Sequence, residues 1–327
     1  MRAVQITQLT GPETATQLVD VPEPAARSHH LSSDEGVVID VAAAGVSFPE
    51  VLQTRGAYQI KPELPFIPGS EVSGIMRSAP AGAAVRPGDR VTALTALGGF
   101  AEVAVAPVPF TFALPAQLDF RQGAGLILNY HTVYFALVTR GRLQRGETVL
   151  VHGAAGGVGT AALQVAKALG ARTIAVVSTD AKEEVARRAG ADHVLRSGGD
   201  WREETKALGG ADIVLDPVGG DRFVDSLRAL RTGGRALVVG FTEGSIPTVK
   251  VNRLLLSNIE VAGAGWGAYA LSRPEYMRDT AGAIARLIEA GTVAPIVGAA
   301  FPLKDAADAL KLIDARVATG KVVLEVR

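Results

Sequence analysis

The sequence predicts an α/β protein in which a strand-rich, barrel-like unit accompanies a doubly wound parallel sheet. Three observations support this prediction. Short β-branched runs separated by Pro/Gly clusters fill the first 120 residues, apolar strands then alternate with helical stretches, and a glycine-rich loop follows the first of those strands. The length of 327 residues suffices for two domains, because domains commonly span roughly 100–200 residues.

The N-terminal region is expected to form a compact antiparallel or barrel-like unit, because it is rich in turns and shows little helical periodicity. The cluster Arg86-Pro-Gly-Asp89 marks one of these turns. Residues 122–139 are largely apolar with small residues interspersed, which predicts a buried helix. The strands expected before that helix are residues 1–10, Val37–Val41, Val91–Leu94 and Glu102–Val105.

The remainder of the chain is expected to build βαβ units and a parallel sheet, because buried apolar strands alternate there with helices of about ten residues. Leu254–Ala262 would supply a sixth strand and the helix before it, and the last part carries an amphipathic stretch at Asp279–Glu289 and a closing strand at Lys321–Val326. Helices are expected at Thr160–Leu169 and Lys182–Ala189. The first five parallel strands are expected at Thr148–His152, Thr173–Val177, His193–Leu195, Ile213–Leu215 and Ala236–Val239.

Composition excludes several classes of function. The chain has 33 Lys and Arg against 33 Asp and Glu, so it lacks the positive charge of a nucleic-acid binder. It has no cysteine, which excludes disulfides, a thiolate nucleophile, iron–sulfur clusters and Cys-based zinc sites. No apolar run approaches the ~18 residues of a membrane-spanning helix, and the first residues do not resemble a signal peptide. We therefore expect a cytoplasmic protein without a membrane partner.

The glycine-rich loop lies between a predicted strand and a predicted helix, which is the context of a dinucleotide fingerprint. Ala154 stands where the usual pattern has its first glycine, Gly156 lets the backbone approach a pyrophosphate, and Gly159 lets helix and strand pack closely. The N-terminus of the helix would supply N–H donors and partial positive charge for the phosphates. The predicted contacts in this loop are Ala154, Ala155, Gly156, Gly157, Val158 and Gly159.

The end of the second predicted strand favours NADPH over NADH. Ser178 follows that strand and can donate to a 2′-phosphate, and Lys182 can neutralise the phosphate charge. Asp180 offers the alternative, because a carboxylate at this edge binds the ribose 2′-OH of NAD. We interpret Asp180 instead as the N-cap of the next helix, with Glu183 at N3 completing a capping box.

These features together resemble the medium-chain dehydrogenase/reductase superfamily, specifically its zinc-free NADPH:quinone oxidoreductase branch. The resemblance implies a GroES-like, partly open β-barrel catalytic domain made of residues 1–123 and 266–327, a Rossmann domain made of residues 124–265, and a homodimer. It covers nearly the whole chain, and the order and spacing of its motifs together make it specific. They are Gly45–Tyr58, Leu64–Glu71, Arg86–Val91, Ala154–Gly159, Asp216–Gly220 and Gly240-Phe241.

Zinc-dependent members of the superfamily carry metal ligands at three positions that hold Ser47, Ser70 and Leu128 in this chain. Catalytic zinc needs three N, S or O ligands and an open position, and two hydroxyls and a leucine do not supply them. The histidines, including His29 and His30, lack a metal-binding spacing such as HExxH. We therefore expect no metal, and chemistry directed at already activated acceptors.

The resemblance implies an NADPH-dependent enzyme that transfers hydride to a small electrophilic substrate, namely a quinone or an activated alkene (enone or enal). Tyr58 falls at the position of the proton-donating tyrosine of related enoyl-thioester reductases, and Ser47 stands where quinone reductases commonly have Asn. Either group could donate to a carbonyl oxygen or an enolate. Two alternatives remain open: an enoyl-thioester (enoyl-CoA or enoyl-ACP) reductase, and a non-catalytic NADPH-binding or redox-sensing protein.

Further cofactor contacts follow from the resemblance. Arg316 aligns with a residue that binds the 2′-phosphate in bacterial relatives, and Arg196 could replace the aromatic side chain that stacks on adenine or lie in solvent. His152 and Trp266 are expected to be packing residues. The remaining predicted contacts are Asn129, Thr132, Val218, Gly240 and Phe241.

Overall fold

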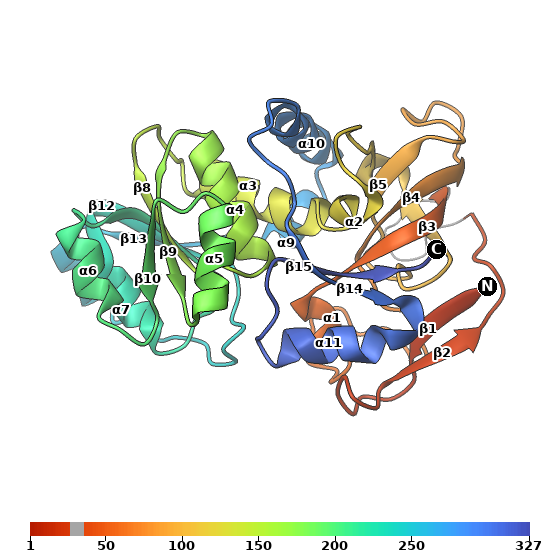
Figure 1. The fold of residues 1–327 in the computed structure, drawn as a ribbon, viewed down its shortest axis with the longest axis horizontal. Helices are drawn as coiled ribbons and strands as arrows, with labels where there is room; N and C mark the ends of the chain where they lie inside the picture. The colour runs from red at the N-terminus through yellow and green to blue at the C-terminus, as the bar shows by residue number, and fades with distance from the viewer. Residues whose placement is uncertain (27–35) are drawn as a thin grey trace. The chain divides into compact units, whose positions relative to one another are not determined.

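The computed structural model describes residues 1–26 and 36–327, so His29 and His30 lie outside the described residues. The chain divides into two compact units (Figure 1). Unit 1 consists of Met1–Leu128, Arg273–Ala285 and Pro295–Arg327, and unit 2 consists of Asn129–Ser272 and Arg286–Ala294.

Unit 1 is built on a mainly antiparallel sheet that, over the described residues, has seven strands. Strand β3 is the long central element, because it pairs with three other strands and its register shifts twice along β4. Such register shifts bend and twist a strand, which favours a barrel-like sheet. The strands are β3 (Gly36–Val46), β4 (Glu71–Ser78), β5 (Arg90–Leu94), β6 (Val103–Pro107), β7 (Thr111–Ala113), β14 (Val297–Pro302) and β15 (Lys321–Glu325).

The remaining elements of unit 1 surround this sheet. A separate antiparallel pair joins β1 (Arg2–Ile6) and β2 (Thr16–Asp20). A core of buried Val, Ile, Ala, Met, Phe and Leu side chains unites the sheet with helix α11. The helices are α1 (Phe48–Gln53), α2 (Phe120–Gly123), the first turns of α10 (Pro274–Glu289) and α11 (Ala306–Asp314), with short 3₁₀ turns at Val108–Phe110 and Leu303–Asp305.

Unit 2 contains a parallel six-stranded sheet in the order β10-β9-β8-β11-β12-β13, as its described residues define it. Numbered within the unit, this is the order 3-2-1-4-5-6, in which the chain reverses direction across the sheet between β8 and β11. Ligands of such sheets bind at the carboxyl ends of the strands, at that point of reversal. The strands are β8 (Thr148–His152), β9 (Arg172–Val177), β10 (His193–Arg196), β11 (Ala211–Asp216), β12 (Leu230–Val238) and β13 (Glu260–Gly263).

Two helices of unit 2 end where local chemistry predicts. Helix α4 is followed by Gly170 and α5 by Gly190, both with positive φ, which is the usual termination by a left-handed glycine. Leu150 and Val214, on central strands, are fully buried in an apolar core shared with the helices. The helices are α4 (Gly157–Ala168), α5 (Asp180–Arg188), α6 (Trp201–Ala207), α7 (Arg222–Ala229), α8 (Asn252–Ser257) and α9 (Trp266–Ala270).

The predicted fold class is confirmed, with differences in detail. The buried helix expected at residues 122–139 is a series of short segments: α2, a π-helical turn at Ile127–His131, α3 (Thr132–Tyr134) and a second π-helical turn at Phe135–Arg140. Strand β12 begins at Leu230 rather than Ala236. Gly233 and Gly234 lie inside the strand and have low β-propensity, so the sequence pattern does not indicate its first residues. None of the helices in the described part of the chain is long and apolar enough to cross a bilayer.

The unit boundaries also differ from the residue numbers expected from the sequence. Unit 1 continues past residue 123 to Leu128, because Ala124 packs on Ala43 and Val323 and the Leu128 N–H donates to Glu71 at 2.9 Å. Residues 286–294 belong to unit 2, where the carbonyl of Ala294 accepts a hydrogen bond from Gln164 at 2.8 Å.

Candidate functional site

The glycine-rich loop of unit 2 forms a tight turn between β8 and α4. Gly153 has a φ of +57° and makes this turn, a role that the sequence pattern assigns to the position of Ala154. A Cβ on Gly159 would lie 2.2 Å from the carbonyl oxygen of Gly153, so only glycine allows the helix to approach the turn. Beside Gly156 the space is open, since a Cβ there would meet only the Gly153 carbonyl, at 3.5 Å. The N-terminus of α4 therefore faces a space that a phosphate group could occupy.

Two further predicted residues come from the helical segment that opens unit 2. Asn129 is buried, and a Cβ on Gly157 would lie 2.6 Å from its Nδ2, so the amide contacts the first turn of α4. Thr132 begins α3 and is half-buried. Asn129 is thus placed against the glycine loop by packing that only glycine at residue 157 permits.

The loops after β11 and β12 meet the glycine loop at the carboxyl edge of the sheet. The Oδ1 atom of Asp216 accepts hydrogen bonds from the N–H groups of Val218 (2.7 Å) and Gly219 (3.0 Å), which fixes the loop after β11. A Cβ on Gly153 would lie 3.2 Å from a methyl group of Val218, and a Cβ on Gly219 would lie 2.9 Å from the ring of Phe241. The structure therefore brings together three segments that carry predicted cofactor contacts.

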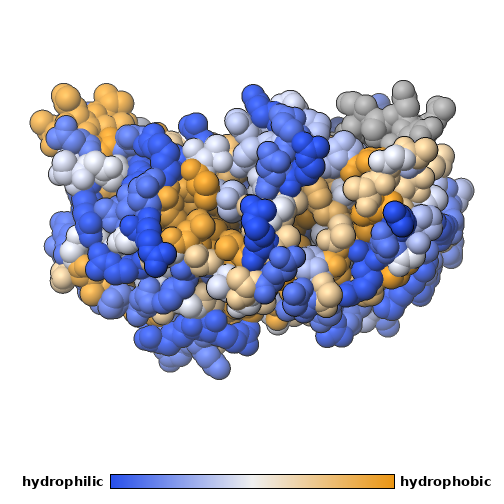
Figure 2. Space-filling view, turned by 90° about the horizontal axis from the view of Figure 1, so that it is seen from above, coloured by the Kyte–Doolittle hydropathy of each residue, from blue (hydrophilic) through white to orange (hydrophobic). Residues whose placement is uncertain are grey.

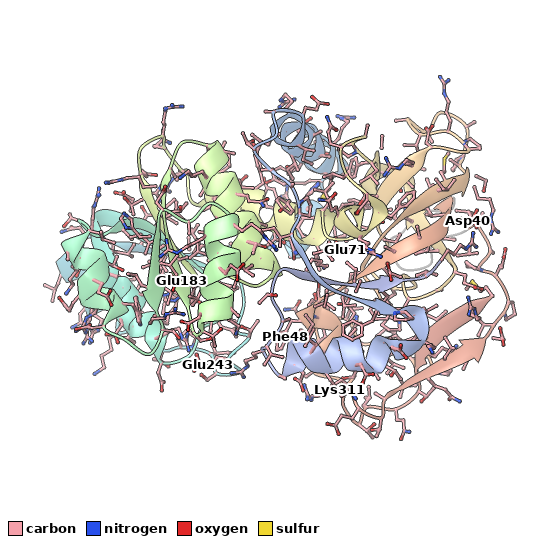
Figure 3. All side chains as sticks on the ribbon, viewed as in Figure 1. Asp40, Phe48, Glu71, Glu183, Glu243 and Lys311 are labelled. Carbon is pink, nitrogen blue, oxygen red and sulfur yellow. The ribbon has the colours of Figure 1, made fainter. Side chains whose placement is uncertain are left out.

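The end of β9 differs from the expected capping arrangement. Thr179, not Asp180, is the N-cap of α5: its backbone is extended and its hydroxyl accepts the N–H of Lys182 at 3.3 Å. Asp180 already lies in the first helical turn, so its carboxylate cannot take the cap position. It accepts a hydrogen bond from Arg196 at 2.5 Å, and Arg196 also bonds Glu183 at 2.5 Å (Glu183 is labelled in Figure 3). The capping-box interpretation of Asp180 and Glu183 is therefore wrong.

Ser178 and Lys182 lie together beyond this cap. The Lys182 ammonium donates to the Ser178 hydroxyl at 3.3 Å, and partial burial lowers the pKa of Lys182. Arg196 ends β10 and forms ion pairs with Asp180 and Glu183. Arg316 lies in unit 1, in the turn after α11, where its φ is +58°, and its role toward a cofactor stays a prediction.

A buried polar cluster in unit 1 surrounds Ser47, the N-cap of α1. The Ser47 N–H donates to Oε2 of Glu50 at 2.9 Å. The other carboxylate oxygen of Glu50 accepts from the N–H of Ser70 (3.0 Å) and from its hydroxyl (2.5 Å). Glu50 is fully buried, and the loss of hydration raises the pKa of Glu50 while the hydrogen bond from Ser70 opposes that rise.

Lys321, the first residue of β15, completes this cluster. Its ammonium donates to the Ser47 hydroxyl oxygen at 2.7 Å and to Oε1 of Glu71, while Oε2 of Glu71 accepts the N–H of Leu128 at 2.9 Å (Glu71 is labelled in Figure 3). Lys321 is 3% exposed and Glu71 is 0% exposed. The sequence pattern predicts Lys321 only as the start of a strand, and a single lysine before Val-Val-Leu carries no signal of burial.

The residues at the three superfamily metal positions do not fit a zinc ion. Ser47 bonds the Lys321 ammonium, Ser70 donates to Glu50, and Leu128 offers only its backbone N–H to Glu71. Zinc requires lone pairs from three ligands, whereas this cluster already contains a buried cation that only donates hydrogen bonds. Among residues 1–26 and 36–327, no group of three His, Cys, Asp or Glu side chains could hold a metal ion.

Tyr58 follows α1 and is half-buried. Burial raises the pKa of the Tyr58 phenol, and the negative charge of Glu50 raises it further. Both effects keep the phenol protonated and make it a weaker acid, because they disfavour the phenolate.

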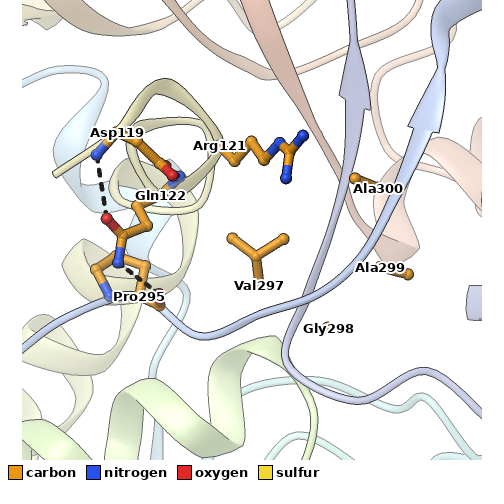
Figure 4. Close-up of a pocket in the computed structure, with 8 residues that line it drawn as sticks. All are labelled: Asp119, Arg121, Gln122, Pro295, Val297, Gly298, Ala299 and Ala300. Carbon is orange, nitrogen blue, oxygen red and sulfur yellow. Dashed lines mark hydrogen bonds between the residues drawn. The ribbon is translucent and has the colours of Figure 1, made fainter.

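Three other features have no predicted role in binding a cofactor or a substrate. A pocket of about 470 Å³ in unit 1 contains none of the predicted site residues; its lining includes Gln122, which is hydrogen-bonded to Asp119 and to the carbonyl of Pro295 (Figure 4). His152 is fully buried, bonds Ser226 at 2.8 Å, and has its pKa lowered by burial to about 3, as a packing residue would. Trp266 is 4% exposed and packs edge-on against a neighbouring imidazole ring.

Comparison with known proteins adds a family context. Two family models match the sequence: "Alcohol dehydrogenase GroES-like domain" over residues 33–116 and "Zinc-binding dehydrogenase" over residues 157–286. A quinone oxidoreductase of Rattus norvegicus is 35% identical over 99% of this chain and 97% of its own length.

Solved structures agree with this context. The quinone oxidoreductase of Thermus thermophilus, also determined in complex with NADPH, matches 100% of both chains with a TM-score of 0.85 and 34% identity. The Escherichia coli quinone oxidoreductase complexed with NADPH matches 100% of both chains with a TM-score of 0.87 and 29% identity.

Proposed function

The chain belongs to the medium-chain dehydrogenase/reductase superfamily as a relative of the quinone oxidoreductases, and from this premise we propose that it is an NADPH-dependent reductase of quinones or of activated alkenes such as enones and enals. The observation that carries the proposal is the cluster in unit 1. Two serines and a leucine stand where zinc-dependent relatives hold metal ligands, and one of these serines accepts a hydrogen bond from a buried ammonium, so the chemistry suits acceptors that are already activated.

NADPH is the cofactor that the groups of unit 2 fit. The open space beside Gly156 and the N-terminus of α4 would take the pyrophosphate, and Ser178 and Lys182 would take the 2′-phosphate. When bound, NADPH supplies the hydride that the acceptor receives. The contact between Asn129 and α4 and the packing of Val218 and Phe241 around the same edge support their assignment as further cofactor contacts.

Unit 1 supplies the groups that orient and protonate the acceptor. The Ser47 hydroxyl is the donor we assign to the carbonyl oxygen of the substrate, where negative charge develops. Tyr58 is the second candidate, although the carboxylate of Glu50 and burial both make its phenol a weaker acid.

Turnover with a panel of acceptors tests the function. Purified protein is mixed with NADPH and, in separate assays, with 1,4-benzoquinone, a medium-chain enone and crotonyl-CoA, and loss of nicotinamide absorbance is followed. We expect oxidation of NADPH with benzoquinone or the enone. Turnover of crotonyl-CoA alone would favour an enoyl-thioester reductase, and NADPH binding without turnover would favour the non-catalytic alternative. Tyr58→Phe in the same assay reports whether the phenol is the proton donor.

Cofactor preference tests the assignment of Ser178 and Lys182. The double substitution Ser178→Ala and Lys182→Ala is expected to raise the Michaelis constant for NADPH by about 10–100-fold, because two hydrogen bonds to a phosphate are lost. The Michaelis constant for NADH is expected to stay unchanged. Lys206→Ala, in the last turn of α6, is the matched control and is expected to alter neither constant. An equal effect on both cofactors would contradict the assignment.

A homodimer through unit 2 is the assembly we propose. Strand β13 is the edge of the sheet, and the segment around α8 exposes large apolar side chains at one corner of unit 2 (Figure 2). Such an edge and patch favour pairing with a second copy. The exposed fractions are 74% for Ile246, 76% for Val251, 76% for Leu255 and 78% for Leu256. Light scattering is expected to give the mass of two chains, and a single-chain mass would exclude the proposal. The cytoplasmic location stays a prediction.

A further inference from the structure

No catalytic step proposed above uses the buried pair of Lys321 and Glu71. Both side chains are almost fully buried. The Lys321 ammonium donates both to the Glu71 carboxylate and to the Ser47 hydroxyl oxygen, the latter at 2.7 Å. A buried ion pair is weak evidence for stability, because apolar residues of the same volume often do as well. An apolar pair, however, could not place a hydrogen-bond donor on Ser47.

The residues around Lys321 and Glu71 show that packing fixes the positions of these two side chains. A Cβ on Gly45 would lie 2.8 Å from Oε1 of Glu71, and a Cβ on Gly125 would lie 2.9 Å from Cγ of Lys321. Two glycines thus leave the room that the carboxylate and the lysine stem fill. The hydrogen bond from the Leu128 N–H holds the second oxygen of Glu71, so the carboxylate cannot turn away from the ammonium.

The direction of the hydrogen bonds decides what Ser47 can do. An ammonium only donates, so the Ser47 oxygen is the acceptor of the bond from Lys321. Across residues 1–26 and 36–327, no acceptor receives the hydroxyl proton of Ser47, and the side chain is half-buried rather than enclosed. That proton is therefore available to a ligand. Tyr58 has the opposite surroundings, because burial and, to a lesser extent, the nearby carboxylate of Glu50 disfavour negative charge on its phenol.

We propose that Lys321 is a positioning residue that makes Ser47 a directed donor to the carbonyl oxygen of a quinone or enone and restores the proton that Ser47 gives away. The inference rests on the proposed function. Hydride addition leaves the acceptor as an oxyanion; the O–H bond of Ser47 breaks and its proton binds that oxygen. One N–H bond of Lys321 breaks and its proton passes to the Ser47 oxygen. The neutral amine regains a proton from water after the product leaves, so charge and electrons balance with hydride as the only reductant.

A double-mutant cycle, read out as kcat, tests the inference. The neutral pair Lys321→Met with Glu71→Gln keeps an acceptor for the Leu128 N–H and removes the donor to Ser47. We expect it to lower kcat by about 10–100-fold with little change in the Michaelis constants, as expected for the loss of a transition-state hydrogen bond. Ser47→Ala is expected to lower kcat at least as much. In the Ser47→Ala background, the neutral pair is expected to change kcat by less than about 3-fold, because the lysine acts through the serine.

Further variants and measurements distinguish this role of Lys321 from a purely structural one. Lys321→Arg keeps a cationic donor to Ser47 but does not release a proton, so we expect it to recover only part of the kcat that the neutral pair loses. The solvent deuterium isotope effect on kcat is expected to fall in both variants. If the neutral pair fails to fold, the pair Lys321→Gln with Glu71→Gln replaces it, because this pair also leaves no buried charge without a partner, and its loss of kcat is expected to show the same dependence on Ser47. Titration of each variant with NADPH measures its affinity for the cofactor and so tests whether the cofactor site of unit 2 is intact.

The outcomes are distinct. Equal losses with and without Ser47, or an unchanged kcat in the neutral pair, would overturn the inference alone. Wild-type protein that binds NADPH but reduces no acceptor would overturn the proposed function and this inference with it.

Discussion

Replacing Lys321 alone with Met is expected to lower the free energy of unfolding by about 3–5 kcal/mol. The substitution leaves Glu71, which is 0% exposed, without the cation that compensates its buried charge. The hydrogen bond from the Leu128 N–H remains, but it cannot replace a full opposite charge. Denaturant unfolding followed by circular dichroism measures the loss.

Two comparisons make this result specific to the buried pair. Adding Glu71→Gln to Lys321→Met is expected to recover most of the lost stability, because the pair is then removed as a whole. The matched control is Lys311→Met on α11, where the ammonium pairs with Asp308 at 2.6 Å on the surface (Lys311 is labelled in Figure 3). We expect no measurable change there, because solvent screens exposed pairs. Equal losses for Lys311 and Lys321 would show that burial does not govern the effect.

This pair also marks the limit of what the sequence predicts. The glycine loop, the parallel strands and the position of Ser178 and Lys182 were predictable, because each is a short-range pattern of residue types. The bond from Lys321 to Ser47 joins residues 274 positions apart, and the bond to Glu71 joins residues 250 apart. No local periodicity encodes such a contact. Ser47 was therefore predictable as a candidate donor, whereas the group that orients it was not.

The capping error at α5 has a different cause. Thr179 and Asp180 are both good N-cap residues and are adjacent, so residue type alone cannot choose between them. In the structure Thr179 is the N-cap, because its hydroxyl accepts the N–H of Lys182, and Asp180 lies in the first helical turn, where it pairs with Arg196. Local propensity therefore predicts that a helix starts at this point of the chain but leaves a one-residue choice open.

Gly159→Ala is expected to cost stability and NADPH binding together. Its methyl group would lie 2.2 Å from the Gly153 carbonyl oxygen and 2.6 Å from Cα of Ala154, both backbone atoms that cannot move without opening the turn. Overpacking of this kind costs about 1–3 kcal/mol, and we expect the upper end because no flexible side chain can give way. Thermal unfolding measures the stability, and fluorescence titration measures the affinity for NADPH, which is expected to fall by about 100-fold or more because the loop no longer presents its N–H groups.

Gly156→Ala is the matched control that separates the ligand from the fold. Its methyl group would enter the open space beside the loop, where the only neighbour is the Gly153 carbonyl at 3.5 Å, in ordinary contact. Gly156 also has φ −82°, which alanine adopts without strain. We therefore expect wild-type unfolding temperature with an affinity for NADPH reduced by about 10–100-fold, because the methyl group takes the place of a phosphate oxygen. Unchanged affinity in Gly156→Ala would mean that the pyrophosphate lies elsewhere, since the fold of this variant has no reason to change.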